Sequence, residues 1–284
     1  MEIKKVLVIG AGQMGGGIAQ VIAQAGVEVL LTDNFTEAIP KRIEFIEGLL
    51  SKNVAKGRMS EEEKKATLDN IKACPDYSQE KDIDLVVEAI VENMEIKKSL
   101  IKSLNDILSD DAIYASNTSS LSVTELATAY KNPEKVIGMH FFNPVPVMKL
   151  IELIRGIATS DETYETVKAL GEKIGKTTVE IKDMPGFAVN RILIPMINEA
   201  INALNTGVAS AKDIDNAMML GANHPMGPLA LADFIGLDTV LSILEVLYKG
   251  FGDQKYAPSP LLRNYVRAGW LGKKTGKGFY DYSK

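Results

Sequence analysis

Short apolar runs alternate with helical patterns through the first half of the chain. The apolar runs have the length and the β-branched content of buried strands, and the segments between them repeat apolar residues at helical spacing. This pattern predicts strands at 6–10, 27–33, 84–90, 112–116 and 135–142, and helices at 14–26, 95–108 and 122–129. Strands that alternate with helices favour a parallel sheet covered by helices on both faces, as in Rossmann-type, doubly wound α/β folds.

One connection in this half is unusually long. Residues 35–68 follow the second predicted strand and are highly charged and helical in pattern, with one break near Lys56-Gly57. Two helical segments joined at such a break favour a helical hairpin. We therefore expect an inserted hairpin that projects from the sheet.

The pattern changes after residue 150. Strands are predicted at 149–154 and 177–181 with a helix at 161–174, and Pro185-Gly186 then breaks the chain. Beyond this break we predict helices at 187–207, 211–220 and 228–251. We expect two domains, residues 1–184 and an all-helical domain of residues 185–284. The first of these helices is apolar on more than one face, which favours a homodimer built on the helical domain.

Composition narrows the range of functions. A net charge of −5 and 46% hydrophobic residues describe an ordinary globular protein without the basic excess of a nucleic-acid-binding surface. No apolar run has the length of a membrane span, and no signal peptide is visible. Cys74 is the one cysteine, so no internal disulfide and no oxidising compartment are needed. We expect a cytoplasmic protein with no nucleic-acid or membrane partner.

A glycine turn follows the first predicted strand and opens the first helix. Gly10, Gly12 and Gly15 fit the pattern G-x-G-x-x-G, which is weak by itself and strong in this position. The first glycine allows a tight turn, the second lets a pyrophosphate approach the backbone, and the third lets helix and strand pack closely. The helix N-terminus offers N–H groups to the phosphates. Cofactor contacts are expected at Gly10, Gly12, Gln13, Met14 and Gly15.

Asp33 ends the second predicted strand. A carboxylate there would accept hydrogen bonds from the adenosine ribose hydroxyls and would repel a 2′-phosphate. The sequence therefore favours NAD, in the form NAD⁺ or NADH, over NADP. A glycine turn that serves packing only is the alternative, and FAD is disfavoured because no second flavin motif is visible.

His140 ends another predicted strand, and Glu152 lies in the next apolar run. The proline-rich bend between them could place the two strands side by side, so that the carboxylate meets the imidazole. One ring nitrogen would then be held, and the other could exchange a proton with an alcohol substrate beside a nicotinamide. A hydrogen-bonded core histidine is the alternative, and Glu152 weighs against it because a buried carboxylate needs a partner. Two histidines and one cysteine supply too few ligands for a metal site.

Seven segments resemble the short-chain L-3-hydroxyacyl-CoA dehydrogenases, in particular the bacterial 3-hydroxybutyryl-CoA dehydrogenases. The resemblance spans essentially the whole chain and is specific. The segments are VIGAGQMGGGIAQ at 8–20, VVEAIVENMEIKK at 86–98, ASNTSSLSVTELA at 115–127, GMHFFNPVPVMKLIELI at 138–154, KDMPGFAVNRIL at 182–193, LGANHPMGPLALADFIGLD at 220–238 and GKKTGKGFYDY at 272–282.

The resemblance implies an NAD-dependent enzyme that interconverts a short-chain L-3-hydroxyacyl-CoA and the 3-oxoacyl-CoA. It implies that His140 is the catalytic acid/base and that Glu152 pairs with it. It implies that Ser119 contacts substrate and cofactor and that Asn190 binds the reacting end of the substrate. Further cofactor contacts fall on Asn143, Glu92, Lys97 and Lys274.

Without the resemblance, several of these residues have plain alternatives. Ser119 and Asn190 are equally compatible with helix-start positions, and Glu92, Lys97 and Lys274 read as solvated charges. Lys52 and Lys56 lie four apart in the hairpin and share a helix face, which suits the phosphates of CoA or an exposed surface equally.

Two other functions remain open at this point. The first is a β-hydroxyacid dehydrogenase that acts on free acids, for which a lysine is expected as the central acid/base. The second is a crystallin-like structural protein that keeps the fold without turnover. Intact Ser119, His140, Glu152 and Asn190 weigh against the second.

Overall fold

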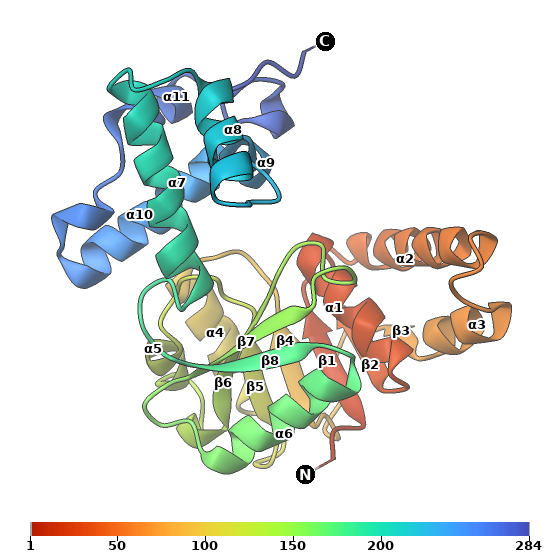
Figure 1. The fold of residues 1–284 in the computed structure, drawn as a ribbon. Helices are drawn as coiled ribbons and strands as arrows, with labels where there is room; N and C mark the ends of the chain where they lie inside the picture. Colours follow the sequence, from red (N-terminus) through yellow and green to blue (C-terminus); the bar gives the residue numbers. More distant parts are fainter. Residues whose placement is uncertain (1, 284) are drawn as a thin grey trace. The chain divides into compact units, whose positions relative to one another are not determined.

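The computed structural model describes residues 2–283, and the chain divides into two compact units (Figure 1). The first unit ends at Asp183, and the second begins at Met184. Each unit has its own apolar core. The chain can therefore be followed one unit at a time.

A single sheet forms the centre of the first unit. Its strand order is β3-β2-β1-β4-β5-β6-β7-β8. The strands are β1 Lys5–Ile9, β2 Glu28–Thr32, β3 Ile71–Ala73, β4 Leu85–Glu88, β5 Ile113–Ser116, β6 Val136–Phe141, β7 Leu150–Arg155 and β8 Thr177–Lys182. The order of β2, β1 and β4 reverses the direction of winding beside β1, which is where doubly wound sheets bind ligands.

The prediction of a parallel sheet holds for every strand pair from β3 to β6. The pair β6 and β7 is antiparallel, because the short connection after Phe141 returns the chain directly. β8 then pairs with β7 in parallel. The three-residue strand β3 was not predicted, since its pattern is too short to separate from the preceding helix.

Helices cover both faces of this sheet. Val6 and Met139 share one core cluster with the apolar side of α1 (Gln13–Gln24) and α6 (Asp161–Lys173). Gly138, the neighbour of Met139, faces the other side and meets α5 (Val123–Ala127), next to α4 (Met94–Leu104). The central strands are apolar almost throughout because neither face meets water.

The predicted hairpin insertion is confirmed. It consists of α2 (Ala38–Ala55) and α3 (Glu61–Asp69), which extend beyond β2 and β3 (Figure 1). Gly57, with a φ of 65°, makes the turn between them. Ser60 and Glu63 then form a capping box that starts α3.

The second unit is helical, as predicted. Its α-helices are α7 Val189–Asn205, α8 Ala211–Gly221, α9 Pro228–Ile235, α10 Leu237–Phe251 and α11 Pro260–Arg267. The single helix predicted at 228–251 is wrong, because Gly236 adopts a φ of 101° and separates α9 from α10. α11 was not predicted. Over residues 2–283, no helix combines the length and the apolar character that crossing a membrane requires.

Candidate active site

The glycine turn joins β1 to α1 and packs against the turn that follows β4. Gly10 has a φ of 113°, and a Cβ there would lie 2.6 Å from the carbonyl oxygen of Ala89. A Cβ at Gly15 would lie 1.8 Å from the carbonyl oxygen of Gly10. At Gly12, by contrast, no atom of residues 2–283 other than those of Gly12 and its two chain neighbours comes within 4 Å of the Cβ position. The first and third glycines allow close packing, and the second leaves space at the N-terminus of α1 that fits a phosphate.

Asp33 lies directly after β2, beside this turn. Its Oδ2 accepts a hydrogen bond from the amide of Ala11 at 2.7 Å, and its Oδ1 accepts one from the amide of Phe35 at 2.9 Å. A carboxylate has about four acceptor sites, so these amides leave capacity for ribose hydroxyls. The turn and the carboxylate together have the chemistry that a dinucleotide requires.

His140 and Glu152 face each other across the antiparallel pair of β6 and β7. Nδ1 of His140 lies 2.8 Å from Oε2 of Glu152. His140 is 6% exposed, and Glu152 is 0% exposed. The structure thus brings together the two side chains that the sequence paired, and it gives the buried carboxylate a hydrogen-bonding partner. Their catalytic roles stay predictions.

Asn143 connects the His140 strand to the glycine turn. It lies directly after Phe142 and precedes a cis peptide bond to Pro144. Its Oδ1 accepts a hydrogen bond from Nε2 of Gln13 at 2.8 Å. Met14, the next residue of the glycine turn, packs against the core of the sheet instead. Two expected cofactor residues, Gln13 and Asn143, are therefore in direct contact.

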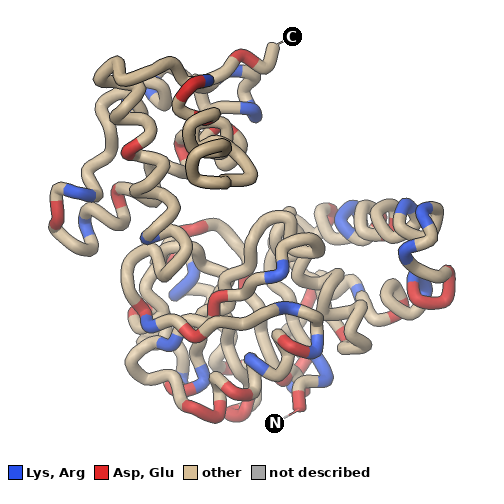
Figure 2. The backbone as a smooth tube through the Cα atoms, viewed as in Figure 1, with Lys and Arg blue, Asp and Glu red and all other residues tan. Residues whose placement is uncertain are grey.

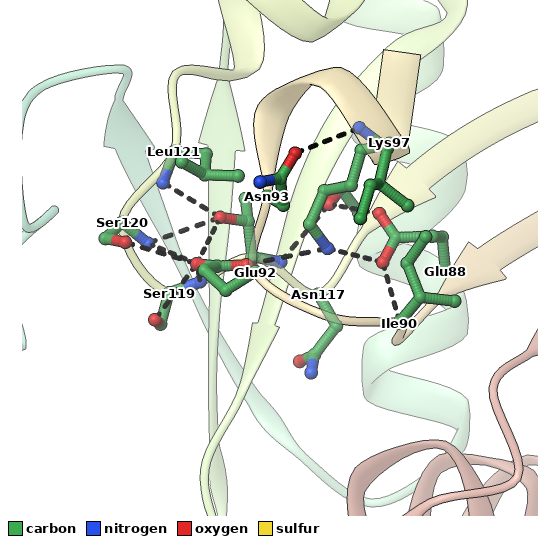
Figure 3. A network of polar contacts seen from close by, with 12 residues as sticks. Glu88, Ile90, Glu92, Asn93, Lys97, Asn117, Ser119, Ser120 and Leu121 are labelled. Atoms are coloured by element: carbon green, nitrogen blue, oxygen red, sulfur yellow. Dashed lines mark hydrogen bonds and ion pairs between the residues drawn. The ribbon is translucent and has the colours of Figure 1, made fainter. Parts of the chain in front are cut away.

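Glu92 follows β4 and holds the turn that follows β5 (Figure 3). Its Oε1 accepts hydrogen bonds from the hydroxyl of Thr118 at 2.7 Å, from the amide of Ser119 at 2.8 Å and from the amide of Ser120 at 3.1 Å. Burial by itself would raise the pKa of Glu92. The nearby Lys97 ammonium and the hydrogen bonds from Thr118 and Ser119 outweigh burial and hold this pKa below its usual value. An ionised carboxylate therefore fixes Ser119 at neutral pH.

Lys97 lies buried between two carboxylates (Figure 3). Its Nζ is 2.5 Å from Oε1 of Glu88 and 3.5 Å from Oε2 of Glu92. Both Lys97 and Glu88 are 0% exposed. The interpretation of Lys97 as a solvated charge is therefore wrong, because two acidic groups from separate segments surround it. Its direct contact with the cofactor stays a prediction.

Glu88 and its partners Tyr114 and Ser116 were missed by the sequence reasoning. Glu88 also accepts hydrogen bonds from the hydroxyl of Tyr114 at 3.0 Å and from that of Ser116 at 2.8 Å. One signal was available, since Glu88 is an acid inside an apolar run, as Glu152 is. The same need for a partner would have pointed to a buried cation nearby.

A cleft of about 710 Å³ lies between α1, α2 and the turn after β6. Gly16 and Gly17 form its α1 side. A Cβ at Gly16 would lie 2.2 Å from the side chain of Arg42, and one at Gly17 would lie 2.9 Å from that of Val145. The cleft is lined by Ala11, Gln13, Gly16, Gly17, Gln20, Ala38, Lys41, Arg42, Phe45, Ile46, Leu49, Asn143, Pro144, Val145 and Pro146.

Two candidate residues belong to the second unit. Asn190 is buried in the first turn of α7. Lys274 lies in a short 3₁₀ turn, Lys273–Thr275, where its Nζ is 2.6 and 2.7 Å from the two carboxylate oxygens of Asp238. Lys274 is thus paired and not simply solvated. The other candidate residues all belong to the first unit.

Comparison with protein-family models assigns both units. The model "3-hydroxyacyl-CoA dehydrogenase, NAD binding domain" matches residues 5–184, and the model "3-hydroxyacyl-CoA dehydrogenase, C-terminal domain" matches residues 186–282. The chain belongs to the 3-hydroxyacyl-CoA dehydrogenase family. The glycine turn, Asp33 and His140 all lie within its NAD binding domain.

Similar proteins cover the whole chain. A 3-hydroxybutyryl-CoA dehydrogenase of Clostridioides difficile is 52% identical over 280 residues, which are 99% of this chain and 100% of that protein. One of Bradyrhizobium diazoefficiens is 54% identical over 280 residues, which are 99% and 96% of the two chains. The crystal structure of (S)-3-hydroxybutyryl-CoA dehydrogenase from Ralstonia eutropha has a TM-score of 0.97, 48% identity and complete coverage of both chains. The resemblance read from the sequence motifs is confirmed.

Proposed function

We propose that this protein interconverts (S)-3-hydroxybutyryl-CoA and acetoacetyl-CoA with NAD as its cofactor. The observation that carries the proposal is the buried contact between His140 and Glu152. The two residues lie on β6 and β7, in the unit that holds the glycine turn. A histidine held by a carboxylate is the group that an alcohol–ketone interconversion needs for proton transfer.

In the reducing direction, His140 gives a proton to the 3-oxo oxygen. Glu152 holds Nδ1, so Nε2 is the ring atom that carries this proton, and the carboxylate stabilises the imidazolium before the transfer. When NADH is bound, its nicotinamide would supply the hydride for C3, so that the 3-oxo group becomes a 3-hydroxy group. Ser119 and Asn190 position the reacting end of the substrate. In the oxidising direction, the neutral ring takes up the hydroxyl proton.

The cleft beside α2 suits the CoA part of the substrate. Apolar side chains that include Phe45 and Leu49 line it. Lys52 lies in the last turn of α2, three residues after Leu49, and Lys56 follows directly after the helix as its C-cap. Figure 2 shows basic residues at the C-terminal end of α2, whereas acidic residues lie at the start of α3. The pantetheine would occupy the cleft, and the two lysines would meet the phosphates.

The cofactor preference rests on Asp33. Its carboxylate would accept from ribose hydroxyls and would repel the 2′-phosphate of NADP. Cofactor contacts at Gly10, Gly12, Gln13, Met14, Gly15, Asn143, Glu92, Lys97, Ser119 and Lys274 complete the proposed site.

The proposal also covers the oligomeric state and the cellular location of the protein. A homodimer would form through the second unit, where Ile192 on α7 is 74% exposed and Leu220 on α8 is 86% exposed. Light scattering on Ile192→Lys and Leu220→Lys would test this, with monomers as the expected result. A cytoplasmic location is favoured because Cys74 needs no oxidising compartment.

An absorbance assay of NADH oxidation tests the function. Acetoacetyl-CoA should be reduced at least a hundredfold faster than free acetoacetate, on the order of what a few lost binding contacts cost, and NADPH should replace NADH poorly. Faster turnover of the free acid would favour a β-hydroxyacid dehydrogenase. Binding of NADH without turnover of either compound would favour a structural role.

A further inference from the structure

A cluster of three charged groups lies where β4 and β5 end, and two of the three are buried. Lys97 and Glu88 form its core, at 2.5 Å and 0% exposure each. Glu92 is the outer member, with a side chain that is 36% exposed and 3.5 Å from the ammonium. Two carboxyl groups from separate segments thus share one ammonium.

Glu88 is held from several directions at once. Its Oε1 accepts from Lys97 and from the amide of Ile90 at 2.9 Å, and its Oε2 accepts from Tyr114 at 3.0 Å and Ser116 at 2.8 Å. These donors come from α4, from the turn after β4 and from β5. Because its acceptor sites are filled by fixed groups, the carboxylate holds the ammonium of Lys97 in one place.

Stability does not explain this cluster. Taking an ammonium and a carboxylate out of water costs more than their attraction commonly returns, and apolar or neutral replacements of such pairs are often neutral or stabilising. Buried polar networks of this kind serve to fix geometry. The geometry that Lys97 fixes is that of Glu92, whose Oε1 binds the turn that carries Ser119.

The glycine turn between β1 and α1 is also in contact with the segment that carries Glu88. The amide of Ala89, the residue after Glu88, donates to the carbonyl of Ile9 at 2.8 Å. The carbonyl of Ala89 occupies the space beside Gly10 that a Cβ would need. A shift of Glu88 would therefore reach the Ser119 turn on one side and the phosphate-binding turn on the other.

We propose that Glu88 is a positioning residue of the dehydrogenase, because it holds Lys97 and, through Lys97, the carboxylate of Glu92. Glu88 fixes the ammonium, the ammonium fixes Glu92, and Glu92 fixes Ser119. This inference rests on the proposed function, because it assigns the three residues to the same site.

A neutral replacement of the core pair tests the proposal. Glu88→Gln and Lys97→Met are combined in one variant, so that no buried charge is left without its partner, and NADH binding is measured by fluorescence titration. The Kd for NADH should rise about tenfold, while the thermal midpoint stays at or above that of the unchanged protein. A pair with only a structural role would lower the midpoint and leave the Kd of the folded protein unchanged, and that result would overturn the proposal.

The matched control is Lys98→Met with Glu125→Gln, an ion pair of 2.6 Å at the surface of the neighbouring helices, which should leave the Kd unchanged.

One further variant keeps the outcome clear. Tyr114→Phe removes one hydrogen bond to Glu88 without a change of charge, and it should raise the NADH Kd about threefold even if the double variant does not fold. An unchanged Kd in that variant would count against Glu88. NADH binding needs no acyl-CoA turnover, so a protein that binds NADH but does not reduce acetoacetyl-CoA refutes the proposed function and leaves this test valid.

Discussion

The pairs His140–Glu152 and Lys97–Glu88 are alike in burial and differ in chemistry. Both carboxylates are 0% exposed and lie on central strands of one sheet. Glu152 holds an imidazole, the side chain that most often transfers protons in enzymes. Glu88 holds an ammonium that has a second carboxylate beside it.

The difference separates proton transfer from positioning. In the proposed reaction His140 exchanges a proton, and the contact of Nδ1 with Glu152 holds its ring in place. A group that fixes its neighbours needs several contacts, and Lys97 lies within ion-pair distance of both Glu88 and Glu92. Substitutions should therefore affect turnover at the first pair and NADH affinity at the second.

The largest effect is expected at His140. His140→Gln should lower kcat by about a thousandfold, because a glutamine amide cannot give a proton to the 3-oxo oxygen as an imidazolium does. NADH affinity should stay within about twofold, since the glycine turn is untouched. Steady-state kinetics and NADH titration measure the two quantities. Turnover at the level of the unchanged enzyme would refute the assigned role.

A smaller loss of turnover is expected at Glu152. Glu152→Gln keeps the size of the side chain and removes the charge that stabilises the imidazolium, so kcat should fall about a hundredfold. NADH affinity should again be retained. Glu180→Gln, on the exposed edge strand β8, is the control and should leave kcat unchanged. Equal kcat values for the two variants would place Glu152 outside the reaction.

Loss of the lysine should lower the free energy of unfolding more at the buried Lys97–Glu88 pair than at the surface pair Lys98–Glu125. Lys97→Met leaves Glu88 buried without its cation, and the free energy of unfolding should fall by about 3–5 kcal/mol. Lys98→Met removes a surface partner of Glu125 and should cost less than about 1 kcal/mol. Chemical denaturation measures both. Similar values for the two lysines would mean that the burial of Lys97 has no energetic consequence.

The smallest effect is the pH dependence at Glu92. Its pKa is lowered from the ordinary value of 4.5, since the Lys97 ammonium and hydrogen bonds outweigh burial. A lowered pKa in the folded state stabilises the protein above pH 4.5, and this contribution is lost as the pH falls through the lower value. The difference in thermal midpoint between the unchanged protein and Glu92→Gln should be full above pH 4.5 and should shrink below it. A difference that is constant down to pH 3 would contradict the assignment.

The sequence by itself determined the parts that depend on local geometry. The glycine turn follows from the conformations and close approaches that Gly10 and Gly15 allow. The contact of His140 with Glu152 follows from two apolar strands joined by a short bend, because cross-strand neighbours on one face meet when the register is set by the turn. The motifs of the family gave the remaining site residues.

Only the tertiary structure decided where long charged side chains lie. Lys97 belongs to a charged helix that reads as a solvated surface, and its burial depends on Glu88 from β4 and Glu92 from the following turn. The sequence pattern also did not reveal the break between α9 and α10 at Gly236. The apolar pattern continues through this residue, and only the backbone conformation shows the turn. Periodicity records which face of a segment is apolar. It does not record which charged groups from other segments will compensate a buried ion, since that depends on how the segments pack.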